Sequence, residues 1–194
     1  MVKCQDDSGY TGSNPVLSLL YFYQRKGEIT MELVFAPRGI LQINDARIMF
    51  RNFRGEGDRF NREGDRNFVL IIPDEEIADA LVKEGWNVKI REPREEGDTP
   101  FMYLPVKVKF SARGPQIHLV TGNKHNLLDE ESVGMIDDID ILSVNMDIRP
   151  YDWVIQEGTP NEKSGRTAYL QSMEVIQEID RFAARYVDEE NIRE

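Results

Sequence analysis

Apolar and polar residues alternate along several short stretches of this chain, and this period of two limits the fold to one built largely from β-strands. In MYLPVKVKF at 102–110, Tyr103, Lys107 and Lys109 alternate with apolar residues. Successive side chains of a strand point to opposite faces of a sheet, so the stretch predicts a strand with one buried and one exposed face. Two lysines and a tyrosine then share the exposed face.

The same pattern recurs along the chain, between residues that favour turns. The other candidate strands are 43–53, 67–73, 116–121, 139–153 and 166–179, and WNVKIRE at 86–92 is strand-like. The apolar residues of 139–153 that are expected to face the core are Leu142, Val144, Met146 and Ile148. Residues 122–138 lack the pattern and are interpreted as a long surface connection.

One stretch, 74–85, has the signals of an α-helix. Asp74 can cap its start and Gly85 can end it. Its expected apolar stripe consists of Ile77, Ala78, Leu81 and Val82. Short strands around a single mid-chain helix predict a mainly β fold, an OB-fold-like barrel of five to six strands with one central α-helix.

The length of 194 residues predicts one domain with extensions. Residues 1–30 match the rest poorly and are either an appended arm or the product of an upstream start codon, with Met31 as the native beginning. Residues 31–179 are assigned to the barrel domain and 180–194 to an acidic-leaning C-terminal tail.

Charge is distributed unevenly along the chain. The net charge of −11 arises entirely in residues 125–194, which hold 6 basic and 17 acidic side chains (6 − 17 = −11), while the remainder is balanced. The single Cys4 cannot form an intramolecular disulfide, which fits a reducing cytoplasm. The apolar run at 15–23 is shorter than the roughly 20 residues that span a bilayer, so no membrane association is expected.

Arginine and phenylalanine interleave in FRNFRGEGDRFNREGDRNF at 50–68, where EGDR occurs twice. Glycine and aspartate favour turns, so this segment is predicted to be a loop between two strands. Bases stack on aromatic rings and arginine planes, and phosphates attract guanidinium groups, so the composition suits an unpaired nucleic acid strand. The alternative is a solvated, salt-bridged loop around a few core phenylalanines.

Alternation in INDARIMFRNF at 43–53 divides this predicted strand into two faces. The core face is expected to carry Ala46, Ile48 and Phe50, and the exposed face Arg47, Met49, Arg51 and Phe53. Phe50 and Phe68 are therefore assigned to the core rather than to base stacking.

An enzyme is the competing class, specifically a metal-dependent nuclease. Asp137, Asp138 and Asp140, with Glu130 or Glu131, have oxygen ligands that suit magnesium. Clustered acids in a connection are usually solvated, however, and no phosphate-binding glycine loop or nucleophile motif accompanies them. The histidines at 118 and 125 lack the spacing of a helical metal pair. We therefore expect no enzymatic activity, no cofactor and no metal, and a virion or regulatory binding protein without DNA affinity is a third alternative.

Two motifs together resemble a known family. GWNVK at 85–89 precedes YLPVKVKF, and IRPYDWVIQEG precedes SGRTAYLQSMEV near the end. This layout, including the corner formed by Pro150, Tyr151 and Trp153, resembles the OB-fold single-stranded DNA-binding proteins of tailed phages, of the podovirus replisome type and its prophage relatives. The resemblance covers about residues 32–180.

The resemblance implies sequence-independent coating of single-stranded DNA during phage replication and recombination, in the cytoplasm of a bacterial host. It also implies an acidic C-terminal tail that contacts a replication polymerase or helicase. This tail departs from the family pattern because it ends DEENIRE, with Arg185 and Arg193 diluting its charge. A homodimer is left open.

The candidate DNA-binding residues come from four segments. They are Arg47, Arg51 and Phe53 from the first strand, Arg54, Arg59, Phe60 and Arg62 from the loop, Tyr103, Lys107 and Lys109 from the lysine strand, and Arg149, Tyr151 and Trp153 as a weaker group. Tyr151 and Trp153 have an equally good interpretation as a packing corner. Lys107 and Lys109 also have an alternative interpretation, as charges that protect an exposed strand from aggregation.

Overall fold

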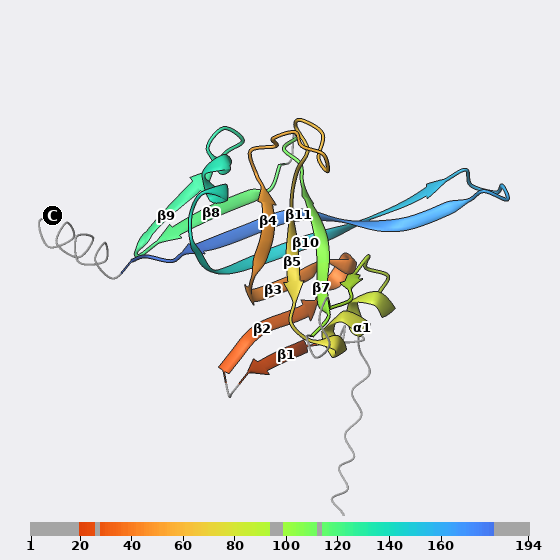
Figure 1. Ribbon diagram of the computed structural model, residues 1–194, viewed down its shortest axis with the longest axis horizontal. Helices are drawn as coiled ribbons and strands as arrows, with labels where there is room; N and C mark the ends of the chain where they lie inside the picture. Colours follow the sequence, from red (N-terminus) through yellow and green to blue (C-terminus); the bar gives the residue numbers. More distant parts are fainter. Residues whose placement is uncertain (1–19, 26–27, 94–98, 112–113, 181–194) are drawn as a thin grey trace, which may run out of the picture.

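The computed structural model describes residues 20–25, 28–93, 99–111 and 114–180 of the chain, which form eleven strands, one α-helix and two short 3-10 helices (Figure 1). The strands are β1 (Leu20–Arg25), β2 (Glu28–Phe35), β3 (Leu41–Ala46), β4 (Ile48–Asn52), β5 (Arg66–Ile72), β6 (Lys89–Arg91), β7 (Phe101–Val108), β8 (Gln116–Thr121), β9 (Lys124–Leu128), β10 (Ile141–Ile155) and β11 (Lys163–Gln177). The helices are α1 (Glu75–Lys83), η1 (Pro37–Gly39) and η2 (Val133–Asp137). The predicted mainly β fold with one α-helix is thus confirmed.

All the strands belong to one mixed sheet. The pairing order is β1-β2-β3-β10-β11-β7-β5-β4, with β6 added to β7 and the β8–β9 hairpin added to β11. The two ends of this path, β1 and β4, are not paired with each other in the described residues, so the predicted closed barrel of five to six strands is not confirmed. No helix in the described part of the chain is long and apolar enough to cross a membrane.

The segment 122–138 differs from its prediction as a surface connection. It contains β9 and η2, and Leu128, Val133 and Ile136 are buried in the core. Four of the five residues of β9 are exposed, so the strand has no apolar alternation that could reveal it.

Helix α1 begins and ends as predicted. The Asp74 carboxylate accepts a hydrogen bond from the backbone N–H of Glu76 at 2.7 Å, and Gly85 has the positive φ of 85° that lets the chain turn away. Ile77, Ala78 and Leu81 are buried. Val82 is 53% exposed, against the prediction, and Ala80 is buried in its place, because the helix turns a slightly different stripe toward the sheet.

The core lies on one side of the alternating strands. In β7 the buried residues are Met102, Leu104, Val106 and Val108, which confirms the alternation predicted there. In β10, Val144, Met146 and Ile148 are buried as expected, but Leu142 is 58% exposed. A register irregularity between Ile141 and Ser143 shifts the alternation at that point, so Leu142 lies outside the core.

Strand β4 contains an irregularity that reverses two predictions. Phe50 has a φ of 49°, and the pairing register with β5 shifts between Met49 and Asn52. As a result Phe50 is 64% exposed rather than buried. Phe53 is fully buried rather than exposed, and its ring stacks on Phe68 with centroids 5.5 Å apart. Phe68 itself is buried as predicted.

Strands β10 and β11 are much longer than the rest, at 15 residues each, and pair from Ile141–Gln177 to Ile155–Lys163. The half of this hairpin nearest its turn projects beyond the other strands as a two-stranded ribbon (Figure 1). We call Arg149–Ile155 with Lys163–Tyr169 the arm; its base, at Ala168 and Tyr169, still pairs with β7, and the remainder is the projecting ribbon. The predicted turn-rich loop at 158–165 corresponds to the arm's tip and the start of β11.

Candidate nucleic-acid interface

The side of the sheet opposite the core carries aromatic and basic residues from neighbouring strands. Residues directly opposite each other in paired strands point to the same side. Tyr103 of β7 lies opposite Ile71 of β5 and Lys89 of β6, and Lys107 lies opposite Asn67 and Tyr169 of β11. We call this surface the outer face. Its members by pairing are Met49, Asn67, Val69, Ile71, Lys89, Arg91, Phe101, Tyr103, Pro105, Lys107, Arg149, Tyr151, Trp153, Gly165, Thr167 and Tyr169, and Phe50 joins them through its ring contact with Phe101.

Three aromatic rings form a row on this outer face. Phe101 stacks on Tyr103 with centroids 5.2 Å apart and an interplanar angle of 29°. Phe50 meets Phe101 edge to face at 6.4 Å, which its positive φ makes possible. Phe101 and Tyr103 are half-buried and Phe50 is exposed. Rings fixed by neighbouring rings yet open to solvent are suited to stacking with bases.

Basic side chains flank this row. Lys89 and Arg91 of β6 lie opposite Tyr103 and Phe101, and all of β6 is exposed. Lys107 is exposed at the other end of β7, and Lys109 is exposed just beyond that end. None of the outer-face residues listed above is acidic, so the charged members of this set are lysines and arginines, although the whole chain carries −11.

The arm continues the outer face beyond β7. Tyr169 lies opposite both Lys107 of β7 and Arg149 of β10. The Arg149 guanidinium lies 5.3 Å from the centre of the Tyr169 ring, and Tyr151 meets the same ring edge to face at 5.9 Å. The weaker candidate group, Arg149, Tyr151 and Trp153, thus adjoins Lys107.

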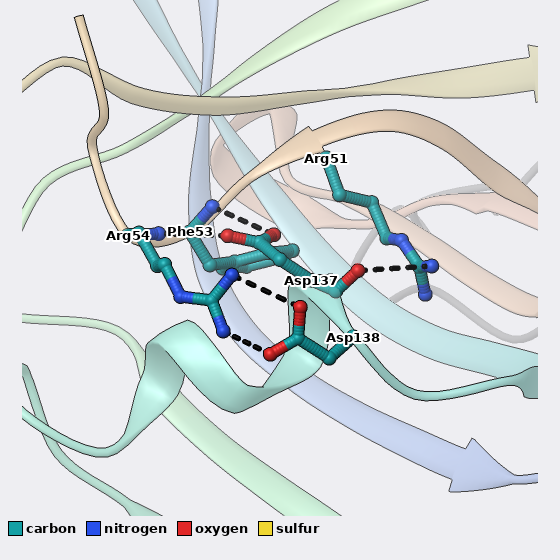
Figure 2. A network of polar contacts seen from close by, with 5 residues as sticks. All are labelled: Arg51, Phe53, Arg54, Asp137 and Asp138. Carbon is teal, nitrogen blue, oxygen red and sulfur yellow. Dashed lines mark hydrogen bonds and ion pairs between the residues drawn. The ribbon is translucent and has the colours of Figure 1, made fainter.

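The loop that joins β4 and β5 is fastened at its base to η2 (Figure 2). The Asp137 carboxylate accepts hydrogen bonds from the backbone N–H groups of Phe53 and Arg54, each at 2.9 Å. The Arg54 guanidinium donates to both oxygens of Asp138, and this contact lowers the pKa of the Asp138 carboxyl. Arg51 donates to the carbonyl oxygen of Ile139 at 2.9 Å.

Arg66 closes the loop from its other end. Its Nε donates to the Phe53 carbonyl at 2.9 Å, and a terminal nitrogen donates to Glu130 at 2.8 Å. Three arginines of the segment 50–68 are therefore engaged with the protein itself. The interpretation of Arg51 and Arg54 as DNA contacts gains no geometric support, and Phe53 is removed from the candidate list because its ring is buried in the core.

The tip of the same loop presents its side chains to solvent. Phe60 is 78% exposed, and the Arg59 guanidinium lies 4.5 Å from the centre of its ring. Asp58 holds the turn, because its carboxylate accepts from the N–H groups of Phe60 and Asn61 at 2.6 Å each, which lowers its pKa. Arg62 is exposed beside them. The loop is thus an anchored base with an exposed Arg–Phe–Arg tip.

Arg47 lies just before β4, and its carbonyl oxygen accepts a hydrogen bond from the backbone N–H of Ile71 at 3.0 Å. It lines a cavity of about 1000 Å³ together with Ile71, Asp45, Asp74 and Glu75. Arg47 thus lies beside the outer-face residue Ile71, next to acidic side chains.

Three of the acids proposed for a metal-dependent nuclease have other partners, and one of them, Glu130, accepts a hydrogen bond from Arg66. Asp137 receives two backbone N–H groups and Asp138 pairs with Arg54. Within the described ranges, no group of three or more histidine, cysteine, aspartate or glutamate side chains is arranged to hold a metal ion.

A family model described as "Putative phage ssDNA-binding domain" matches residues 31–194. The chain belongs to this phage ssDNA-binding family. The resemblance inferred from GWNVK and the Pro150–Trp153 corner is therefore confirmed at the level of the family. Among solved structures, the chain is similar to the "Single-stranded DNA-binding protein from bacteriophage Enc34, C-terminal truncation", at 13% identity and a TM-score of 0.49, covering 86% of this chain and 99% of that one. Comparison with curated protein sequences gives no match.

Sequence reasoning missed several residues of the outer face in this member of the ssDNA-binding family. Phe101 stands two residues before Tyr103, and the same alternation that selected Tyr103 also selects it. Tyr169 similarly alternates with buried Ala168 and Leu170. Phe50 had no sequence signal, because its exposure depends on the irregularity in β4.

Proposed function

We propose that the protein is a sequence-independent single-stranded DNA-binding protein that coats and protects DNA during phage replication and recombination, acting in the cytoplasm of its bacterial host. Membership of the phage ssDNA-binding family supports the DNA-binding part of this proposal. The observation that carries it is the row of Phe50, Phe101 and Tyr103 on the outer face, bordered by lysine and arginine.

The mechanism requires no covalent chemistry. Basic side chains attract the phosphates, and the exposed rings stack with successive bases, which explains tolerance of any base sequence because every base has a π-face. The loop tip, with Arg59, Phe60 and Arg62, adds cations and a ring from a neighbouring element. The fixed base of this loop limits the conformational entropy lost when the tip binds DNA.

The C-terminal tail at 180–194 is proposed to contact a replication polymerase or helicase. Its residues 181–194 lie outside the described residues, so the proposal depends on the composition of the tail. Acidic side chains compete with DNA for any basic surface that they reach.

The test is fluorescence anisotropy with labelled single-stranded and duplex DNA, at two salt concentrations, with and without magnesium. We expect salt-sensitive, magnesium-independent binding that favours single strands. Tyr103→Ala should weaken binding by about 1–3 kcal/mol, the range measured for one stacked base. Val82→Ala, on the exposed side of α1, is the matched control and should bind as the unmodified chain does.

Two outcomes would overturn the proposal. Magnesium-dependent loss of the DNA would indicate a nuclease, and absence of binding to either form would indicate a virion or regulatory protein.

A further inference from the structure

Trp153 is held in an unusual position on the arm. It lies directly opposite Gly165. A β-carbon at position 165 would come within 2.6 Å of the Trp153 Cζ2 atom, so the indole occupies the space that any side chain there would need. The indole Nε1 donates a hydrogen bond to the Thr167 hydroxyl at 3.1 Å. Glycine and threonine on the partner strand thus fix the ring against the ribbon.

This position is not explained by packing into the core. Trp86, the other tryptophan, is 3% exposed and belongs to the core cluster, whereas Trp153 is half-buried and does not. The indole covers Gly165 on one side, and Trp153 is only partly buried. The arm that carries it projects beyond the rest of the sheet (Figure 1). A ring fixed on one side and open on the other is a stacking surface.

The ring also lies on the same side as the aromatic row. Trp153 is four residues along β10 from Arg149, about 13 Å at the usual rise of a strand. Between them, Tyr151 is 54% exposed and contacts Tyr169, which lies opposite Lys107. Aromatic and basic side chains therefore continue without an acidic residue from β7 to Trp153.

The opposite side of the arm is braced against α1. Arg166 pairs with Asp152 through two nitrogens, at 2.6 and 2.9 Å, and donates a third bond to the Glu84 carbonyl. Its guanidinium also lies 5.5 Å from the centre of the Trp86 ring. These contacts fix the direction of the arm, so Trp153 has a set position relative to the outer face.

We propose that Trp153 is a second stacking subsite for single-stranded DNA, separate from the row on β7, and that Gly165 and Thr167 are the residues that position it. The inference rests on the proposed function and extends it. A strand that crosses the outer face continues along the arm and stacks one further base on the indole.

The test compares two oligonucleotides, of about 5 and about 16 nucleotides, which approximate the extremes of coverage by one OB-type domain. Trp153→Ala should weaken binding of the longer one by about 5- to 150-fold, as expected for one stacked base, and leave the shorter one nearly unchanged. Gly165→Ala should have the same effect by displacing the ring. Val154→Ala, on the opposite side of the arm, is the control and should change neither. Thermal unfolding verifies that each variant is folded.

Tryptophan fluorescence gives an independent measurement. The longer oligonucleotide should quench the emission, and Trp153→Phe should abolish most of the quenching, because buried Trp86 cannot stack with a base. Unchanged affinity of Trp153→Ala for the longer oligonucleotide would overturn the inference. Loss of self-association in this variant without loss of DNA binding would also overturn it, because the ring would then be a contact between copies of the chain. If the unmodified chain binds neither oligonucleotide, the proposed function itself fails.

Discussion

Removing the Asp137 side chain tests whether the base of the β4–β5 loop is a structural anchor. In Asp137→Ala, the backbone N–H groups of Phe53 and Arg54 lose their acceptor. A hydrogen bond to a charged group contributes about 1.5–3 kcal/mol net, and we apply this range to the part-buried Phe53 bond. The Arg54 bond is exposed and contributes about 0.5–1 kcal/mol.

The sum, about 2–4 kcal/mol, predicts a fall in melting temperature of about 4–16 °C for a chain of this size. Differential scanning calorimetry measures it, with Asp140→Ala as control, because Asp140 is an exposed acid of the same connection. Asp137→Asn retains one acceptor oxygen and should show roughly half of the effect. A melting temperature of Asp137→Ala that equals that of Asp140→Ala would refute the assignment of Asp137 as an anchor.

Three other predictions concern charge. Replacing Arg59 and Arg62 together by alanine should weaken binding and lower the slope of log affinity against log salt by about 1.4 units, or about 0.7 for each phosphate contact on a single strand; an unaltered slope would exclude the loop tip from the interface. Arg166 lowers the pKa of Asp152, so the stabilisation from this pair is complete above the ordinary carboxyl pKa of about 3.9 and is lost as pH falls through the lower folded-state value. Asp152→Asn should therefore reduce the acid sensitivity of unfolding below about pH 4, and equal sensitivity in both proteins would contradict this. Deleting 180–194 should tighten DNA binding modestly, by removing acids that compete with DNA, and weaker binding would argue against that competition.

The parts of the fold that could be predicted depend on local sequence. The exposed side of β7 follows from alternation alone, and Tyr103, Lys107 and Lys109 lie where the pattern places them. Helix α1 is similarly defined by Asp74 and Gly85 within one short segment.

The parts that could not be predicted depend on distant partners. Arg51 and Arg54 are residue types that commonly contact DNA, but their hydrogen-bond partners in the protein are 84 to 88 residues away, in the connection before β10. The predicted burial of Phe50 and exposure of Phe53 are reversed because the pairing of β4 with β5 is irregular. Alternation within one strand cannot reveal such an irregularity. The number of cations in a loop sequence therefore overestimates the number of phosphates that the loop can contact, because some of the cations bind other parts of the protein.

The arm has a mechanical consequence, because β10 and β11 build both the core and the projection. From Ile148 to Ile155 the pairing with β11 is uninterrupted, so the ribbon has no hinge of its own. The nearest irregularity lies between Asp147 and Ile148, where the Ser172 hydroxyl donates to the Asp147 carboxylate at 2.8 Å. A force applied at the tip is therefore transmitted along both strands, first to the contact of Arg166 with the Glu84 carbonyl and then to this bulge in the sheet. The arm is supported at two points of the folded domain, the end of α1 and the bulge between β10 and β11.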